Sequence, residues 1–263
     1  DLRMSRGLGD VYKRQVQYMP QLTTPPAITG PDDAYSQLRH RIIDFTLLPG
    51  EFLSENALAS QMGTSRATVR EAIARLAEEG CVEVFPQRGT QVSRISINRL
   101  HHAVFLRTVL EESVLRQLCS TGITPEQFEA LEESLRKQRR YYDDQASSDL
   151  LDEDTRMHHL FYEYCGREHA WDSISIINCD MMRIRQLQIM TYSYKVHMVA
   201  VGSWENTLTE HRMMLDCLRR RDAEAIAVMC HQHLGFITRD ADHLRRLYPQ
   251  YFYENEKSED LNF

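Results

Sequence analysis

Four side chains in the C-terminal half of this chain have the types and spacing of a metal site. They are one aspartate and three histidines, Asp154, His158, His211 and His233. Asp154 and His158 are four residues apart, so on a helix they share one face. Three imidazoles and one carboxylate suit a divalent transition metal such as Zn, Ni, Mn or Fe, without selecting among these ions. These four residues are therefore candidate metal ligands.

The two later histidines need a pair of antiparallel helices to bring them together. A turn is expected near Arg221 and Asp222, with His211 ten residues before Arg221 and His233 twelve after it. At about 1.5 Å per residue, both imidazoles then lie ~15–18 Å from the turn. Helices whose axes are ~8–10 Å apart allow such side chains to meet. Because a single helical histidine is more often an ordinary surface or core residue, the prediction depends on the whole set.

Helical periods dominate from residue 97 onward and predict an all-α domain of about six helices. Thr124 and Gln127 have the spacing of a capping box, and Pro125 stands at the first helical position, which together indicate a helix start. The expected helices cover 97–120, 125–142, 150–164, 169–190, 203–220 and 222–247. The fourth of these allows a break. This domain has to position the candidate ligands.

The stretch 58–73 has the pattern of a helix-turn-helix. A short helix ends at Gly63, and after a tight turn a second helix opens with Ser65, Arg66, Thr68 and Arg70. N–H groups at a helix start and hydroxyls bind phosphate, and arginines reach phosphates or guanine edges. Arginines four residues apart are also common on a solvated helix face. The surrounding elements favour DNA binding over this plainer interpretation.

Elements on both sides of that stretch predict a winged helix-turn-helix. Residues 33–46 carry the apolar stripe of a first helix, and Ser54 is an N-cap for the second. Residues 81–93 have the pattern of a strand, a turn and a returning strand. Three helices and this hairpin place Arg88 at the tip of the wing, where a further DNA contact is expected.

Residues 33–94 resemble the winged helix of the GntR family of transcriptional regulators. The resemblance is carried by Pro49-Gly-Glu-Phe-Leu-Ser-Glu55, Leu58-Ala59, Gly63, Ser65-Arg66, Val69-Arg-Glu-Ala72, Leu76, Gly80 and Arg88-Gly-Thr90. It implies that the recognition helix contacts DNA through Ser65, Arg66, Thr68 and Arg70, and the wing through Arg88. Asn56 stands where some members of the family have a DNA-contacting arginine.

Residues 97–245 resemble the FCD ligand-binding domain of the FadR subfamily. The matching segments surround the four candidate ligands and include Gly166. The resemblance implies that Asp154, His158, His211 and His233 bind a metal whose coordination is completed by a small carboxylate effector. Arg107 lies where family members often have an arginine facing the pocket, so it could pair with that carboxylate. A surface ion pair is the alternative role for Arg107.

Composition limits how the chain can bind DNA and where it works. The net charge is −7, and residues 31–96 themselves carry 7 basic and 9 acidic side chains. DNA binding therefore needs a local basic face. Its candidates are Arg66, Arg70 and Arg88, with Arg39 or Arg41 beside them.

The six cysteines form no Cys-x-x-Cys, no apolar run approaches the ~20 residues of a membrane span, and no secretory signal is visible, which predicts a cytoplasmic protein.

The sequence predicts a mainly α protein with four segments. They are a disordered or non-native lead-in (1–30), a winged helix-turn-helix DNA-binding domain (31–96), an all-α metal- and effector-binding domain (97–250) and an acidic tail (251–263). We expect a homodimeric regulator that binds a palindromic double-stranded operator and is controlled by a small organic acid at the metal site. One alternative is a metal-dependent enzyme acting on a small carboxylate or ester, with an appended DNA-binding domain, because a metal with these ligands and an open coordination position can activate water. Another is direct sensing of the metal.

Overall fold

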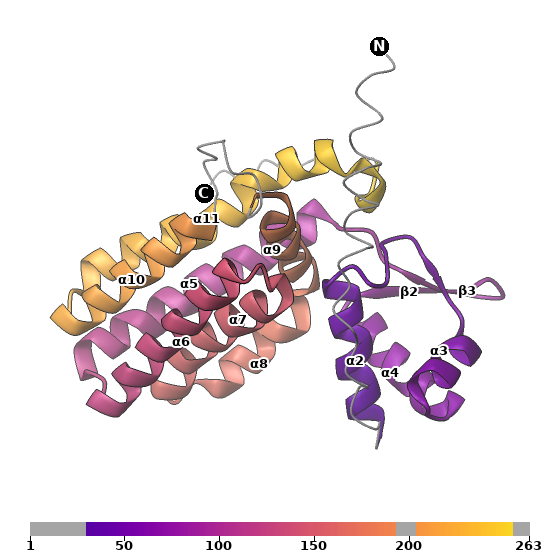
Figure 1. The fold of residues 1–263 in the computed structure, drawn as a ribbon, viewed down its shortest axis with the longest axis horizontal. Helices are drawn as coiled ribbons and strands as arrows, with labels where there is room; N and C mark the ends of the chain where they lie inside the picture. Colours follow the sequence, from indigo (N-terminus) through magenta and orange to yellow (C-terminus); the bar gives the residue numbers. More distant parts are fainter. Residues whose placement is uncertain (1–29, 193–203, 255–263) are drawn as a thin grey trace, which may run out of the picture.

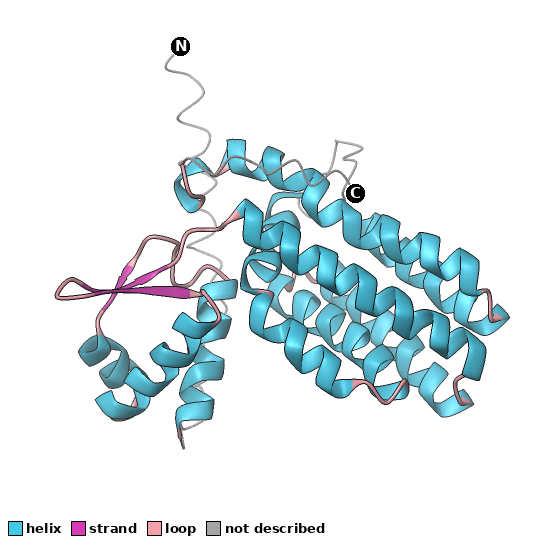
Figure 2. Cartoon of the chain, turned by 180° about the vertical axis from the view of Figure 1, so that it is seen from behind, coloured by secondary structure: helices cyan, strands magenta, loops and turns pink. Residues whose placement is uncertain are grey.

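The computed structural model describes residues 30–192 and 204–254. Figure 1 shows a smaller N-terminal part, which holds the strands, beside a larger bundle of helices. The view from behind in Figure 2 shows the same separation. Residues 1–29 of the predicted lead-in and 255–263 of the predicted tail lie outside the described residues. The mainly α fold expected from the sequence is confirmed.

The N-terminal part is a winged helix-turn-helix, as predicted. Its elements are α2 (Pro31–Ile43), β1 (Phe52–Leu53), α3 (Glu55–Met62), α4 (Arg66–Glu78), β2 (Val82–Phe85) and β3 (Gly89–Val92). The strands form an antiparallel sheet in the order β1-β3-β2, with Val84 opposite Thr90 and Phe52 opposite Gln91. The sequence predicts the β2–β3 hairpin but not β1, because two residues are too few to show an alternation.

Local hydrogen bonds fix the turn between α3 and α4. The hydroxyl of Ser54 accepts a bond from the N–H of Ala57, and the hydroxyl of Ser65 accepts one from the N–H of Thr68. Each satisfies an N–H group at a helix start that has no partner within the helix. Gly63 ends α3 with a φ of 61°, a left-handed conformation that glycine adopts without steric cost. These caps set where α4 begins and which side chains occupy its first turn.

A hydrophobic core shared with α2 packs against one face of α4. Leu38 and Ile42 of α2 are fully buried with Val69 and Leu76 of α4. Cys179, from the helical domain, belongs to the same core. Truncating one such side chain to alanine typically costs about 2–5 kcal/mol. Packing therefore holds α4 in place, and the exposed arginines at its start, Arg66 and Arg70, take no part in this core.

The C-terminal domain has seven α-helices within the described residues. They are α5 (Ile97–Thr121), α6 (Pro125–Asp143), α7 (Ser147–Tyr164), α8 (Glu168–Ile177), α9 (Cys179–Tyr192), α10 (Trp204–Arg220) and α11 (Ala223–Leu247). The sequence predicts about six because it counts 169–190 as one helix in which a break is allowed, and the structure has that break. The break falls at Asn178, whose side chain accepts a hydrogen bond from Arg39 of α2. This long-range contact leaves no local signal in the sequence.

Helix α9 runs through the interior of the molecule. Twelve of its 14 residues are buried, so it has no polar face that would mark it as an amphipathic helix. Its buried charged side chains, Asp180, Arg183 and Arg185, need partners to offset their desolvation. Arg183 and Arg185 are two residues apart and so point to nearly opposite sides of the helix. Each has its main partner in a different part of the protein.

The chain after α11 folds back instead of starting a free tail at residue 251. A 3-10 turn, Pro249–Tyr251, leads to Phe252, which is buried and forms a parallel bridge with Ile95. The hydroxyl of Tyr253 donates to Glu83 of β2 at 2.6 Å. Three aromatic residues therefore precede the acidic run, and their apolar area favours burial.

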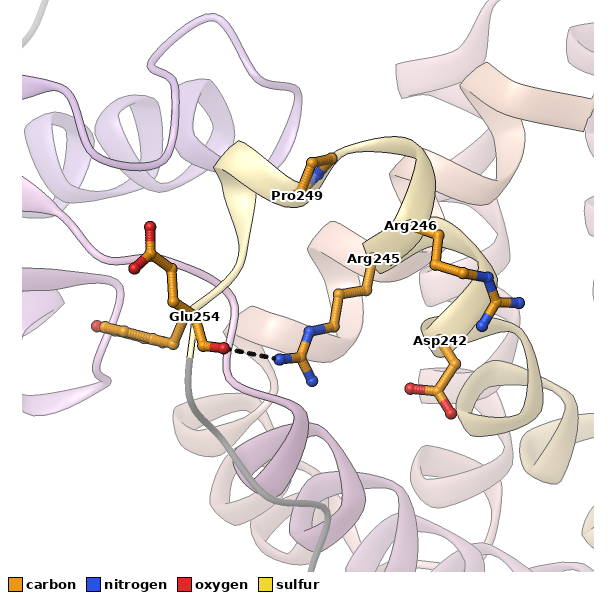
Figure 3. A pocket seen from close by; sticks show the side chains of 6 residues that line it. Asp242, Arg245, Arg246, Pro249 and Glu254 are labelled. Carbon is orange, nitrogen blue, oxygen red and sulfur yellow. Dashed lines mark hydrogen bonds between the residues drawn. The ribbon is translucent and has the colours of Figure 1, made fainter.

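A surface pocket of about 370 Å³ lies beside this segment. It is lined by Asp242, Arg245, Arg246, Pro249, Tyr253 and Glu254 (Figure 3). Arg245 donates to the backbone carbonyl oxygen of Glu254 at 3.2 Å, which ties the end of α11 to the returning chain. None of the site residues predicted from the sequence lines this pocket.

Candidate functional site

Three buried histidines from three helices meet in the helical domain. They are His158 of α7, His211 of α10 and His233 of α11. Each offers one ring nitrogen, and the three nitrogens all lie within 4.8 Å of one another. Nε2 of His158 is 3.3 Å from Nε2 of His233, and the His211 and His233 ring centroids are 4.8 Å apart. The antiparallel pairing of the last two helices predicts this meeting, and the structure shows it.

Asp154 completes the predicted set of four. Its Oδ1 lies 3.5 Å from Nε2 of His211 and 4.0 Å from Nε2 of His158. The spacing of four residues on α7 puts Asp154 and His158 on one face, as expected. The structure therefore brings together all four side chains singled out from the sequence. It also adds a neighbour, because Nη2 of Arg185 lies 2.9 Å from the same Oδ1.

The outer nitrogen of each imidazole faces an oxygen acceptor. Nδ1 of His158 lies 2.6 Å from Glu111, Nδ1 of His211 lies 2.9 Å from Gln138 and Nδ1 of His233 lies 2.8 Å from Glu210. An Nδ1–H that donates to such an acceptor leaves Nε2 with its lone pair directed inward. Histidines that ligate metals are commonly oriented in this way. Sequence reasoning missed Glu111, Gln138 and Glu210; only Glu210, next to His211 in the matching motif, gave a signal.

Burial keeps the central imidazoles neutral. It holds the pKa of both His158 and His211 well below the ordinary range, since the protonated ring would have to give up hydration. Neutral imidazole is the form that ligates metals. Nε2 of His211 and Oδ1 of Asp154 are buried and make no hydrogen bond within the described residues. Although Arg185 lies beside this Oδ1, neither atom has an aligned hydrogen bond, and a cation held here would satisfy both.

Arg107 lies at this cluster and is not part of a surface ion pair. Its side chain is only 2% exposed, and its Nε donates to Glu111 at 3.1 Å. Nη2 of Arg107 is buried without a hydrogen bond. Glu111 therefore joins Arg107 to His158. Of the two buried arginines of α9, Arg185 lies at the cluster and Arg183 does not.

Arg183 ties α9 to the linker between the two domains. Its guanidinium donates to the backbone oxygen of Ser93 at 2.6 Å and pairs with Asp180 on its own helix. Asp180 in turn accepts from Nε of Arg99 at 2.6 Å and from the backbone N–H of Ser96. One helix thus carries a residue at the histidine cluster and a clamp on the chain that leads to the DNA-binding domain.

The start of α4 presents the residues predicted to contact DNA. The side chains of Arg66 and Arg70 are 59% and 63% exposed, and both pair with Glu55 of α3, at 3.5 and 3.0 Å. The hydroxyls of Ser65 and Thr68 are 2.8 Å apart, and Ser65 is also the N-cap of the helix. Glu55 lowers the local positive charge, an effect that the spacing of these residues in the sequence did not predict.

The wing carries the fifth predicted contact. Arg88 is exposed in the turn between β2 and β3, and its guanidinium lies 5.9 Å from the ring centroid of Phe85. The labelled strands in Figure 1 show that this hairpin projects from the winged helix. Arg39, a further candidate for the basic face, is instead half-hidden beside Glu79 and Asn178, where it joins the two domains. Of the two alternatives Arg39 and Arg41, Arg39 is thus engaged between the domains, which the sequence could not show because it does not reveal which face of α2 meets the helical domain.

These features define a class of protein, the DNA-binding transcriptional regulators with a winged helix-turn-helix and a second, helical domain. Residues 32–92 match the model of bacterial regulatory proteins of the gntR family, and residues 102–236 match that of the FCD domain. The chain belongs to the GntR family of regulators and carries an FCD domain. The resemblance inferred from the sequence is thereby confirmed.

Similar proteins support the same assignment. The chain is 30% identical to the HTH-type transcriptional repressor RspR of Escherichia coli K12, over 84% of this chain and 92% of that protein. It is also 30% identical to the uncharacterized HTH-type regulator YdfH of E. coli O6:H1, over 89% and 97%. Among solved structures it shares the fold of E. coli McbR/YncC, with a TM-score of 0.68 at 18% identity, over 84% of this chain and 99% of that one.

The relatives decide between the regulator and enzyme interpretations. They are named as transcriptional regulators, so the chain is a DNA-binding regulator and not the metal-dependent enzyme considered as the alternative. Within residues 30–192 and 204–254, no helix combines the length and apolar character needed to cross a membrane.

Proposed function

We propose that this regulator controls its operator through a small organic acid bound at a metal in the FCD domain. The metal ligands would be Asp154, His158, His211 and His233, and the ion would be Zn, Ni, Mn or Fe. The observation that carries the proposal is the convergence of three buried Nε2 atoms, each on a ring whose Nδ1 faces an oxygen. Such an ion would offer the acid open coordination positions. Arg107, with its unpartnered Nη2, would neutralise a carboxylate.

On the DNA side, Ser65, Arg66, Thr68, Arg70 and Arg88 would contact the operator. The exposure of Arg66 and Arg70 at the helix start supports this role, because both side chains can reach outward to DNA without disturbing the hydrophobic core. Glu55 would have to release them, in part, when they meet phosphates or guanine edges. RspR, one of the relatives, is named a repressor, and we propose repression for this chain as well.

Two copies of the chain would bind one palindromic operator. A single recognition helix reads one half-site, and two-fold dimers place two such helices on DNA. The helical domain is the proposed dimer interface. Phe105, Leu106 and Val109, one to four residues apart on α5, expose 43%, 43% and 50% of their surface, which suits a contact between copies. Since its target is DNA, we place the regulator in the cytoplasm.

The contacts of α9 supply a route from the acid to the operator. Arg185 meets Asp154 at the histidine cluster, and Arg183 holds the linker at Ser93. A ligand that binds or displaces the Arg185 side chain would therefore act on α9, the helix whose Arg183 holds the linker. This would shift the population of DNA-competent dimers, as linked binding equilibria require.

Calorimetric titration of organic acids into three forms of the protein tests the proposal. The forms are metal-loaded protein, chelator-stripped protein and a metal-treated His211→Ala variant. Binding heat only in the metal-loaded form supports a metal-dependent effector site. Equal binding in all three forms would contradict it. Metal affinity should also rise when the acid is present, because the coupling between two ligands is reciprocal.

A further inference from the structure

A second buried arginine faces the histidine cluster and lacks a full set of partners. The Arg185 side chain is 3% exposed, and its Nη2 lies 2.9 Å from Oδ1 of Asp154. Neither Nε nor Nη2 of Arg185 makes an aligned hydrogen bond within the described residues. Its other contact is with the ring of Trp204, 4.7 Å away.

Arg107 differs from Arg185 in having an aligned hydrogen bond to its counter-ion, which it shares with His158. Its Nε donates to Glu111, whereas Arg185 shares Asp154 with the two nearest histidines. A cation held by Asp154 and the imidazoles would lie beside the Arg185 guanidinium. Asp154 would then have to offset the charge of both the ion and the guanidinium, and buried positive groups repel each other strongly when they are not fully compensated. The environment of Arg185 therefore favours an anionic ligand more than that of Arg107 does.

The charges around the cluster set how many negative charges this ligand should carry. Glu111, Asp154, Arg107 and Arg185 are all buried, and their formal charges cancel. The neutral imidazoles add nothing. Glu210 is at the edge, partly exposed and bonded to His233. A divalent ion would add two positive charges that the buried side chains do not offset, and buried charge is costly when it is uncompensated.

We propose that the effector is a dianion, a small dicarboxylic acid, with one carboxylate between the metal and Arg185. The second carboxylate would meet the free Nη2 of Arg107. This inference rests on the proposed metal site and names the chemical class of its ligand. It makes Arg185 an effector-binding residue that selects dianions over monoanions. A 2-hydroxy monocarboxylate could also chelate the ion, but it would leave one positive charge uncompensated.

A matched pair of probes tests the charge directly. Succinate and succinamate have the same length, and succinamate replaces one carboxylate with a neutral amide; malonate and malonamate form a shorter pair, and glutarate and glutaramate a longer one. Each is titrated into the zinc-loaded full chain. For the pair whose length fits, the diacid should bind at least about 10-fold more tightly, as expected for a buried hydrogen bond to a charged group. In the Arg185→Gln variant the ratio of the two affinities should fall toward one. The control is Arg116→Gln, which should keep the ratio, because Arg116 of α5 pairs with Glu112 and Glu224.

Zinc affinity is measured separately, by competition with a chromophoric chelator. A wild-type chain that binds no zinc overturns the proposed metal site and this inference with it. Zinc binding combined with equal affinity for diacid and half-amide at all three lengths overturns this inference alone. An Arg185→Gln variant that binds zinc and keeps the full preference removes Arg185 from the assignment. The comparison of probes on the wild-type chain does not depend on whether the variant folds.

Discussion

Replacing Arg66 with alanine should weaken operator binding by about 1–3 kcal/mol, or roughly 5- to 150-fold, if the side chain reads a guanine. The structure explains why the loss should appear in binding and not in folding. The Arg66 side chain is 59% exposed, and its 3.5 Å pair with Glu55 lies near the surface, where such pairs contribute about 0–1 kcal/mol. The core beneath α4 does not use this side chain.

Arg75 provides the matched control for Arg66. It lies in the last turn of the same helix, is 44% exposed and pairs with Asp32, away from the helix start. Arg75→Ala should change operator affinity by less than about 0.5 kcal/mol, the usual range for surface substitutions. The assay is fluorescence anisotropy at fixed salt, with an operator selected by the purified chain from a randomised DNA pool. Equal losses for Arg66→Ala and Arg75→Ala would refute the proposed docking of α4.

Three further outcomes are expected. Glu111→Gln should lower metal affinity by roughly 10- to 100-fold, because it weakens the partner that orients His158, and chelator competition measures this. Residues 95–263 alone should sediment as a dimer, and a monomer at micromolar concentration would contradict the proposed interface. In chelator-treated protein, stability should fall below about pH 6.5, since the pKa values of His158 and His211 are lowered in the folded state and the unfolded chain takes up protons first. Each of these histidines should contribute up to about 1.4 kcal/mol per pH unit to the urea-unfolding free energy, and His211→Gln should remove one contribution.

The ligand set was predictable because it depends on helix spacing. Asp154 and His158 share a face through their separation of four, and His211 and His233 lie at nearly equal distances from one turn. Those relations need only the geometry of a single helix and of one antiparallel pair. The helix starts at Thr124 and Asp222 were equally visible, because a cap and its partner lie within three residues.

Features set by contacts between distant segments were not predictable in this way. Helix α9 is buried on all sides, so no periodic pattern separates it from α8, and the hydrogen bond from Arg39 to Asn178 at the break joins residues about 140 positions apart. The roles of Arg183 and Arg185 depend on which side of α9 meets the linker and which meets Asp154. A single sequence contains no local signal for either packing choice.

The measurement closest to the central claim is operator affinity in the presence of metal and acid together. Anisotropy titrations would compare the zinc-loaded full chain, the chelator-stripped chain and Asp154→Ala, each with and without succinate or the better-fitting diacid. The proposed mechanism predicts that the acid changes operator affinity only in the zinc-loaded wild-type chain, while all three forms still bind the operator without acid. An acid response of the same size in the stripped chain and in Asp154→Ala would contradict control through this metal site.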